Sequence, residues 1–381
     1  MLYFIIICIA VPFIISFILG FAVRNLALRY NFVDAPNLTE LSQGKNHKTH
    51  TAVTPLGGGA AIFAAIAVSI IGVYAAGVFS EVFAPFLPES ISELLQKHAD
   101  GILYSIRKPF FLLGMCAILF ALGFIDDLRG LSWQFRIAVE CAVAVGTVCM
   151  GWRMSLFLGD SPAMIVLTGV LSVFWIVGLM NSFNMLDNMD GLSSGVGAIC
   201  ALFLAAFALR QPESGGEVQW FVGGLLLILS GALLGFLMHN RHPAKMFMGD
   251  CGSYIIGYLL AAGSLSAVFA GPNAARQAIL APLCVMAIPL YDTFSVIFLR
   301  IRKGKSPFVG DANHLSHRLV RLGLSRPGAV RTIYLMTCAC SVGAMILPKS
   351  NLCLSAAVAA FTVGIIASIG FFEWAQSKST K

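Results

Sequence analysis

Two adjacent carboxylates, Asp126 and Asp127, stand at the end of a long apolar segment. At the C-terminal end of a helix, the two negative charges of such a pair repel each other. The negative end of the helix dipole destabilises both of them further. A divalent metal ion or a cationic partner would relieve both effects, which makes the pair a candidate metal site. The alternative is a solvated loop in which Arg129 acts as the counter-ion.

Amides and carboxylates recur at three-residue spacing before another apolar segment, at Asn181, Asn184, Asp187 and Asp190. On a helix, this spacing places the four side chains on roughly one face. Helix capping would account for Asp190 or Asn181, but not for four polar residues in register. We therefore expect this face to line a polar substrate site.

A glycine-rich turn carries a third carboxylate at Asp250, close to the cations Arg241 and Lys245. An oxygen ligand, cations and exposed backbone N–H groups are the components of a metal–phosphate site. Asp250 could also simply cap the helix that follows. Phe247, in the same loop, is suited either to stacking on a base or to anchoring the loop at a membrane interface.

Two histidines, His314 and His317, lie in the most basic part of the sequence. A helix from residue 314 onward would place them on one face with Arg318 and Arg321, a pattern that suits phosphate groups. Attraction of a basic loop to anionic lipid explains the arginines but not the histidines. Ser316 would be rotated about 200° from His314, so we do not expect it to reach the same phosphates.

A further cationic segment contains Lys48 and His50 and precedes the glycine-rich run Gly57-Gly58-Gly59. Cations followed by a glycine-rich helix entry indicate an anion site, although weakly on their own.

The composition indicates that membrane helices position these groups. Of the 381 residues, 58% are apolar and 11% are charged, against roughly 25% charged in a typical soluble domain. The mean hydropathy is +0.85. A soluble globule and a disordered chain are excluded, and a membrane β-barrel fits poorly, because the apolar runs are continuous. We expect an all-α polytopic membrane protein, with residues 1–381 forming one domain.

Eleven windows are long and apolar enough to cross about 30 Å of hydrocarbon at about 1.5 Å per residue. They lie near residues 2–23, 56–79, 109–125, 133–150, 162–180, 192–209, 218–238, 252–270, 277–299, 332–347 and 352–372. An odd number of spans places the two termini on opposite sides of the membrane.

Basic residues are concentrated on one side of this layout. With the N-terminus outside, the inner segments carry 17 Lys and Arg residues and the outer segments carry 7. The positive-inside rule therefore predicts an external N-terminus and a cytoplasmic C-terminus. The net charge of +7 then reflects topology and does not indicate nucleic-acid binding. The inner segments that carry the candidate groups are 24–54, 126–132, 181–191, 239–251 and 300–331.

The one-sided placement of polar groups favours an enzyme that joins a soluble anionic substrate to a lipid at the interface. A transporter would place such groups near the middle of the bilayer. Only Glu140 and Asp292 lie clearly within predicted spans. Asp292 is the residue that favours the transporter alternative.

These motifs, in this order, resemble the polyprenyl-phosphate N-acetylhexosamine-1-phosphate transferases of glycosyltransferase family 4. The resemblance covers nearly the whole chain, from Asp34-Ala35-Pro36 to His317. Ser306-Pro307-Phe308 and His314-Leu315-Ser316-His317 resemble the branch that initiates surface polysaccharides from UDP-N-acetylglucosamine. The peptidoglycan branch would show a run of three histidines, which is missing here. The remaining motifs are His50 with Pro55 and Gly57-Gly58, Asp126-Asp127, Asn181 to Leu192, and Pro243 to Asp250.

The resemblance implies transfer of N-acetylglucosamine 1-phosphate from UDP-GlcNAc to undecaprenyl phosphate in a bacterial plasma membrane, with Mg²⁺ or Mn²⁺ and release of UMP. A different UDP-N-acetylhexosamine, including UDP-MurNAc-pentapeptide, is the alternative donor. Whether the protein forms a homodimer stays open. The residues that the resemblance implicates fall into four roles: catalysis by Asp126, Asp127, His314 and His317; metal binding by Asp250, Asp126, Asp127 and Asn184; nucleotide-sugar binding by Asn181, Asn184, Asp187, Asp190, Asn240 and Phe247; and phosphate binding by Lys48, His50, Lys245 and Arg318.

Overall fold

The part of the chain that the computed structural model describes is almost entirely helical. The structure describes residues 1–34, 53–83, 85, 89, 92–93, 101, 106–154, 161–210, 218–266, 276–307 and 313–379. Within these ranges, the extended structure is one short antiparallel pair, β1 (Val33–Asp34) with β2 (Thr54–Pro55).

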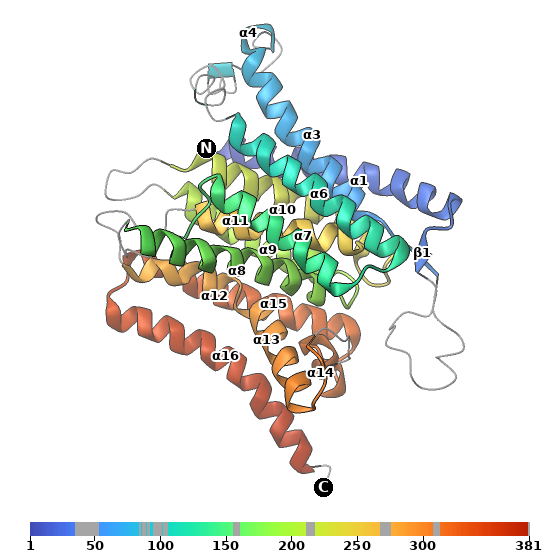
Figure 1. The fold of residues 1–381 in the computed structure, drawn as a ribbon, viewed down its shortest axis with the longest axis vertical. Coiled ribbons are helices and arrows are strands. Elements are labelled where there is room, and N and C mark those ends of the chain that lie inside the picture. The colour runs from blue at the N-terminus through green and yellow to red at the C-terminus, as the bar shows by residue number, and fades with distance from the viewer. Residues whose placement is uncertain are drawn as a thin grey trace.

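Figure 1 labels the helices in chain order. Those before residue 270 are α1 (Leu2–Arg29), α3 (Gly58–Val78), α4 (Ser80–Phe83), α6 (Arg107–Arg129), α7 (Trp133–Cys149), α8 (Pro162–Leu186), α9 (Leu192–Leu209), α10 (Trp220–Asn240) and α11 (Asp250–Ser266). Those after it are η2 (Arg276–Leu280), α12 (Ala281–Val285), α13 (Ala287–Arg302), α14 (Leu315–Arg321), α15 (Arg326–Ala344), η3 (Leu347–Lys349) and α16 (Leu352–Ser379).

The described helices confirm a polytopic α-helical membrane protein, because in lipid the backbone must satisfy its own hydrogen bonds. Eight helical segments in the described ranges are long and apolar enough to span a membrane. The segment Gln277–Val285, which joins η2 to α12, and α13, bent from it by 69°, would together make a ninth. The other two predicted windows contain α7 and α11, each with 17 described residues. The count of eleven spans and the orientation stay predictions.

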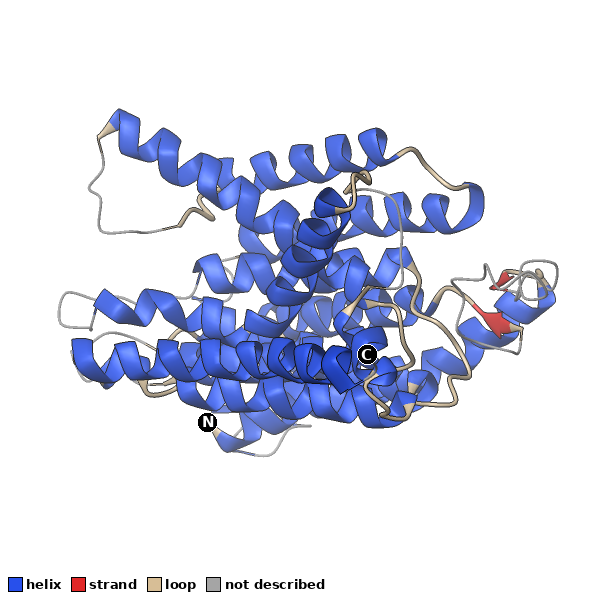
Figure 2. Cartoon of the chain, turned by 90° about the horizontal axis from the view of Figure 1, so that it is seen from below, coloured by secondary structure: helices blue, strands red, loops and turns tan. Residues whose placement is uncertain are grey.

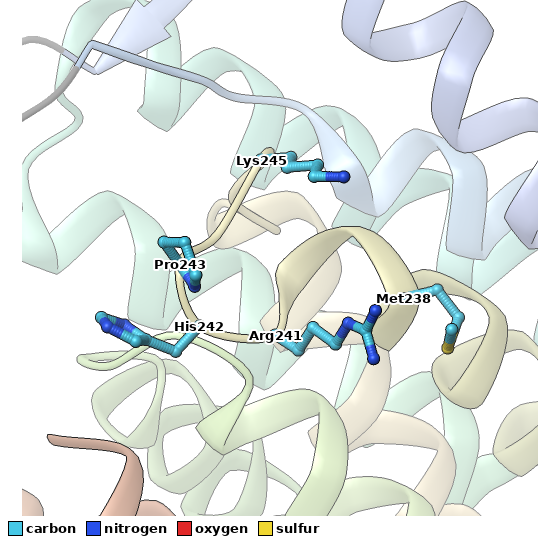
Figure 3. Close-up of a pocket in the computed structure, with 5 residues that line it drawn as sticks. All are labelled: Met238, Arg241, His242, Pro243 and Lys245. Carbon is cyan, nitrogen blue, oxygen red and sulfur yellow. The ribbon is translucent and has the colours of Figure 1, made fainter.

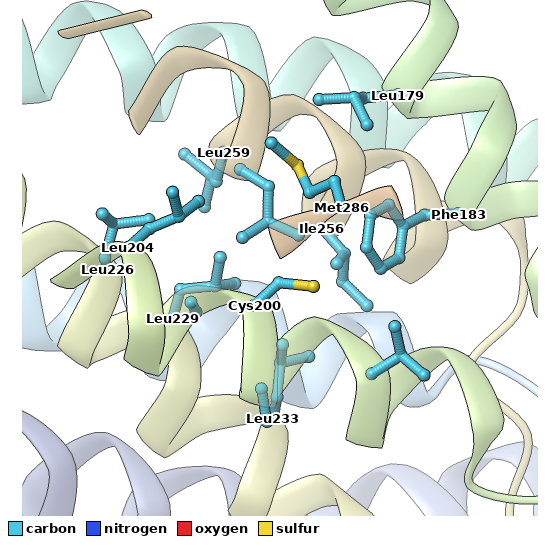
Figure 4. Close-up of a cluster of buried hydrophobic side chains, with 14 of the residues drawn as sticks. Leu179, Phe183, Cys200, Leu204, Leu226, Leu229, Leu233, Ile256, Leu259 and Met286 are labelled. Atoms are coloured by element: carbon cyan, nitrogen blue, oxygen red, sulfur yellow. The ribbon is translucent and has the colours of Figure 1, made fainter. Parts of the chain in front are cut away.

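The long helices pack side by side around an apolar core, with β1 and α14 at the opposite end of the bundle from the N-terminus (Figures 1 and 2). The core brings together side chains of α8, α9, α10 and α11 (Figure 4). Cys200 is one of them and is fully buried. All ten cysteines are free, and the six buried ones pack as small hydrophobes.

Several helices continue past the apolar windows predicted for them; α6 does so by four residues and α8 by six. Hydropathy marks where a helix meets lipid, whereas the backbone hydrogen bonds continue into the polar region. Asp126, Asp127, Asn181 and Asn184 therefore lie on the final turns of helices, which give these side chains fixed directions.

The first turn of α11 is held between α3 and α6 at two glycines. A Cβ on Gly59 would lie 2.4 Å from the nitrogen of Gly252, and one on Gly123 would lie 2.3 Å from the nitrogen of Cys251. Only residues without a side chain allow backbones to approach so closely. This contact brings the beginning of α11 against the end of α6.

We predict that Gly123→Ala displaces α11 and destabilises the protein by about 1–3 kcal/mol, because the added methyl group overpacks a backbone contact. Gly114→Ala, on the same helix, is the matched control, since a Cβ there meets nothing within 4 Å. The melting temperatures of the detergent-solubilised variants test the prediction. Equal melting temperatures for the two variants would contradict it.

Candidate active site

Three carboxylates converge where α6 ends and α11 begins. Asp126 and Asp127 come from the last turn of α6, and Asp250 is the first residue of α11. The backbone N–H of Asp250 donates to Asp127 Oδ1 over 3.0 Å. The cap of α11 is thus supplied by α6, at the helix end whose dipole favours negative charge. We call Asp126, Asp127 and Asp250 the acidic centre.

Arg136, in the first turn of α7, places its guanidinium beside the acidic centre. Its Nη1 lies 2.7 Å from Asp126 Oδ2 and 3.6 Å from Asp250 Oδ2. Asp126 Oδ1 also accepts from the N–H of Leu131 over 2.6 Å. Sequence reasoning missed Arg136 because it falls inside a predicted span. A lone cation in an apolar window was the available signal, since ionisable residues in membrane helices usually have a function.

The two amides near the end of α8 take different partners. Asn184 Nδ2 donates to Asp250 Oδ1 over 2.7 Å and to Ser253 Oγ over 3.1 Å, so this side chain belongs to the edge of the acidic centre. Asn181 Nδ2 instead donates to Glu140 on α7 and to the backbone of α8. Asn181 therefore reaches the acidic centre only through its neighbours on α7.

The prediction that four polar residues share one helical face is wrong beyond Asn184. α8 ends at Leu186, and Asp187 already has non-helical backbone angles. The chain then turns into α9 through Gly191, whose φ of +76° favours glycine. Asp187 and Asp190 consequently lie in a loop.

This loop feels the charge of the acidic centre and binds the segment before Asp250. Burial, with smaller contributions from the charges of Asp127 and Asp190, raises the pKa of the Asp187 carboxyl to about 7. Asp190 Oδ2 accepts from His242 Nδ1 over 2.7 Å and from the N–H of Ala244 over 3.1 Å. Asp190 thereby fixes the loop that leads from α10 to Asp250.

Asn240, at the end of α10, is 2% exposed and joins the same two loops. Its Oδ1 accepts from the N–H of Gly191 over 3.0 Å and from Ser194 Oγ over 3.1 Å. Its Nδ2 donates to the carbonyl of Met246 over 3.0 Å. Asn240 is thus held by two backbone groups and one hydroxyl of the described chain.

The loop after α10 presents cations and Phe247. Lys245 and Arg241 line a cavity of about 280 Å³ together with His242, Pro243 and Met238 (Figure 3). The cationic lining suits an anion.

The backbone of Phe247 is held at the beginning of α3. Its N–H donates to the carbonyl of Pro55 over 2.8 Å, and its carbonyl accepts from Gly58 over 2.9 Å. Phe247 is therefore attached through its backbone to the glycine-rich entry of α3.

α14 begins one residue later than predicted. His314 precedes the helix with extended backbone angles (φ −60°, ψ 151°), so it does not share a helical face with His317. The reason is that its side chain and the following N–H bind Asp292 outside the helix. The centroids of the two imidazoles are nevertheless 6.4 Å apart. Burial, with a smaller contribution from the positive charge of Arg321, lowers the pKa of His317 to about 4.

The remaining polar side chains of α14 dock it on its neighbours. Arg318 is 7% exposed; its Nη2 donates to Ser295 Oγ over 2.9 Å, and its guanidinium lies 5.3 Å from the ring centroid of Tyr291. Ser316 donates to Asn188 Oδ1. The latter contact joins α14 to the loop that carries Asp187.

The two carboxylates inside predicted spans also belong to this region. Asp292 binds the beginning of α14, and Glu140 accepts from Asn181. Neither contact resembles the midplane ion site that would favour a transporter. Lys48 and His50 lie outside the described residues.

The acidic centre has the chemistry of a magnesium site. No three Asp, Glu, His or Cys side chains form a ready metal cage in the described ranges. However, Mg²⁺ is usually held by one or two carboxylates, with water and substrate phosphates completing its shell. The centre offers carboxylate oxygens from two helices, and the buried Asp127 Oδ2 has no hydrogen-bond partner within the described chain. These oxygen donors fit Mg²⁺ or Mn²⁺.

Comparison with known proteins points in one direction. Residues 109–268 match the model of glycosyl transferase family 4. The chain is 30% identical to the "Probable undecaprenyl-phosphate N-acetylglucosaminyl 1-phosphate transferase" of Bacillus subtilis, over 91% of this chain and 87% of the relative. It is 33% identical to the decaprenyl-phosphate N-acetylglucosaminephosphotransferase of Mycolicibacterium smegmatis, over 82% and 74%. It is 26% identical to the undecaprenyl-phosphate alpha-N-acetylglucosaminyl 1-phosphate transferase of Escherichia coli, over 82% and 76%.

The segment that matches the family model begins in α6 and ends after α11, so it includes all three residues of the acidic centre together with Arg136 and Asn184. The similarity to the Bacillus subtilis and Mycolicibacterium smegmatis proteins extends over most of both chains. The chain therefore belongs to glycosyl transferase family 4.

Proposed function

We propose that this protein transfers N-acetylglucosamine 1-phosphate from UDP-GlcNAc to undecaprenyl phosphate, releasing UMP, at the cytoplasmic face of a bacterial plasma membrane. The observation that carries the proposal is the acidic centre, which α6 and α11 form beside Arg136 at the ends of membrane helices. A water-soluble and a lipid-borne phosphate can meet at such a place. The names of the relatives support the choice of both substrates.

The reaction joins two anions. An oxygen of the lipid phosphate attacks the sugar-linked phosphorus, and the bond from this phosphorus to the bridging oxygen breaks, leaving with UMP. A phosphate monoester is largely a dianion at neutral pH, since its second pKa is about 6. Most lipid phosphate molecules are therefore already deprotonated and need no general base. The demand on the protein is to position the phosphates and to offset their charge.

The acidic centre and Asn184 would hold the cation. When bound there, Mg²⁺ or Mn²⁺ supplies positive charge that neutralises the reacting phosphates and the leaving group. Arg136 adds a fixed cation, already oriented by its contact with Asp126. Because Asp127 caps α11, its carboxylate keeps Asp250 in place as well as contributing charge.

The surrounding side chains divide into a nucleotide side and a phosphate side. Asn181, Asp187, Asp190, Asn240 and Phe247 form the nucleotide-sugar side; Asp190 and Asn240 act there by fixing backbone. Lys245, Arg318, His314 and His317 form the phosphate side, and we assign Lys48 and His50 to it from sequence. His317, neutral at physiological pH because of its lowered pKa, can donate one hydrogen bond to a phosphate oxygen without carrying charge.

Purified protein should release UMP from UDP-GlcNAc only when undecaprenyl phosphate is present, and faster than from other UDP-N-acetylhexosamines. Asp250→Asn keeps the side-chain shape but removes its charge, so we expect UMP release to fall by at least about 100-fold, in the range found for preorganised electrostatic groups. Glu89→Gln, an exposed carboxylate, is the control. Activity of Asp250→Asn within tenfold of wild type would assign the cation elsewhere.

The proposed orientation makes residues 300–331 cytoplasmic. A cysteine introduced by Ser306→Cys, in a background lacking the exposed Cys149 and Cys353, should resist a membrane-impermeant maleimide in intact cells. A cysteine introduced by Ser92→Cys should react. The reverse labelling pattern would overturn both the orientation and the cytoplasmic assignment of the site.

The lowered pKa of His317 predicts a pH-dependent stability. Its folded-state pKa of about 4 lies below the ordinary value of 6.5, so the unfolded chain binds this proton more readily. The contribution to stability is therefore complete above pH 6.5 and is lost as the pH falls towards 4. Between about pH 7.5 and 4.5, the melting temperature of the wild type should fall more than that of His317→Gln. Parallel curves for the two proteins would refute this prediction.

A further inference from the structure

Asp292 is a fully buried carboxylate on α13 that makes two contacts with the beginning of α14. Its Oδ2 lies 2.9 Å from Nδ1 of His314, and its Oδ1 accepts from the N–H of Leu315 over 2.5 Å. The side chains of Asp292 and His314 are 1% and 8% exposed, respectively. A carboxylate buried in a membrane helix is costly unless it is paired, and here both oxygens are used by consecutive residues of one segment.

The pairing fixes the proton on the imidazole. An ionised carboxylate only accepts hydrogen bonds, so Nδ1 of His314 must be the donor. In the neutral ring, Nε2 then carries the lone pair, and it is the ring nitrogen left for another partner. The bond from Leu315 to the other oxygen holds the carboxylate itself, so the orientation of the imidazole is fixed at both ends.

The docking of α14 does not depend on Asp292 alone. Leu315 and Leu319 are buried in the core, Arg318 binds Ser295 on α13, and Ser316 binds Asn188. The carboxylate is thus not required merely to hold the helix in place. What it supplies that the other contacts do not is the choice of tautomer at His314.

We propose that Asp292 is a positioning residue for the transfer reaction: it fixes the Nδ1–H tautomer and the direction of His314, so that Nε2 is presented to the substrate phosphates. This inference rests on the proposed function, in which His314 belongs to the phosphate side of the site. It also gives the carboxylate within the span a role other than transport.

Asp292→Asn tests the proposal with almost no change in size. An amide oriented to keep its oxygen on the N–H of Leu315 turns its NH₂ towards Nδ1, which must then become the acceptor. The proton moves to Nε2, giving the opposite tautomer. In proteins labelled with ¹⁵N-histidine, which contain only seven histidines, the ring nitrogen shifts of His314 should therefore exchange between protonated and unprotonated positions.

The His314 signals are assigned by their loss in His314→Asn, and Ser341→Ala, which removes a buried hydroxyl of α15, is the control for an unrelated polar deletion. Unchanged shifts in Asp292→Asn would overturn the proposal. This measurement requires no turnover, so it remains decisive even if wild-type protein fails to release UMP, a result that would overturn the proposed function instead.

Kinetics supply the second arm. Asp292→Asn should lower kcat for UMP release by about 100-fold or more, as expected for a wrong histidine tautomer, with KM for UDP-GlcNAc changed by less than about threefold. In a His314→Ala background, the same change should cost less than about threefold, because a residue that acts through His314 has nothing left to orient. Full, multiplicative losses in the double variant would show a merely structural role.

Asp292→Glu covers the possibility that the asparagine variant does not fold. It retains the charge and both acceptor oxygens, so the Nδ1–H tautomer should be preserved. Its kcat should be at least about tenfold higher than that of Asp292→Asn. A folded Asp292→Glu protein with the opposite tautomer would contradict the proposal. So would a folded Asp292→Asn protein with wild-type kinetics.

Discussion

Three carboxylates can share one corner of a membrane protein only if their repulsion is offset, and this constraint organises the end of the bundle where α6 ends and α11 begins. Three groups offset this repulsion: the N–H of Asp250 at the positive end of α11, the N–H of Leu131, and the guanidinium of Arg136. The N–H of Asp250 is in place because α11 approaches α6 closely, whereas Leu131 and Arg136 reach Asp126 through the turn from α6 into α7. The electrostatics of the site therefore depend both on this close helix packing and on the turn that follows α6.

The outer parts of the site are joined to this corner by polar contacts between segments far apart in sequence. Asp190 and Asn240 connect the loop after α8 with the loop before α11, and Ser316 connects α14 with Asn188. Asp190 and Asn240 hold backbone N–H groups, whereas Ser316 binds the side chain of Asn188. The residues that recognise substrate can then be few, because a larger number of polar residues fix the loops that carry them.

Much of this arrangement was predictable from the sequence. Continuous apolar runs indicated the helices, and the order of the motifs indicated the family, since both are local patterns. The sequence did not reveal which side chains on different helices contact each other. Arg136 looked like an incidental cation in a span, and Asp292 looked like evidence for transport; their meaning depends on Asp126 and His314, which lie on other helices. The predicted faces also failed where a helix ended early, at Leu186, or began late, at Leu315, because three-residue spacing cannot show where a helix stops.

The glycine contacts at Gly59 and Gly123 determine which parts of the molecule can open locally. They join the beginning of α11 to α3 and α6 through main chain, with no rotatable side chain between them. Solvent fluctuations and exchange of annular lipid act first on helices such as α16, many of whose side chains are exposed along its length. The amide hydrogens of the first turn of α11 should consequently be among the slowest to exchange with solvent. Outer helices can then unfold locally while the acidic centre keeps its geometry.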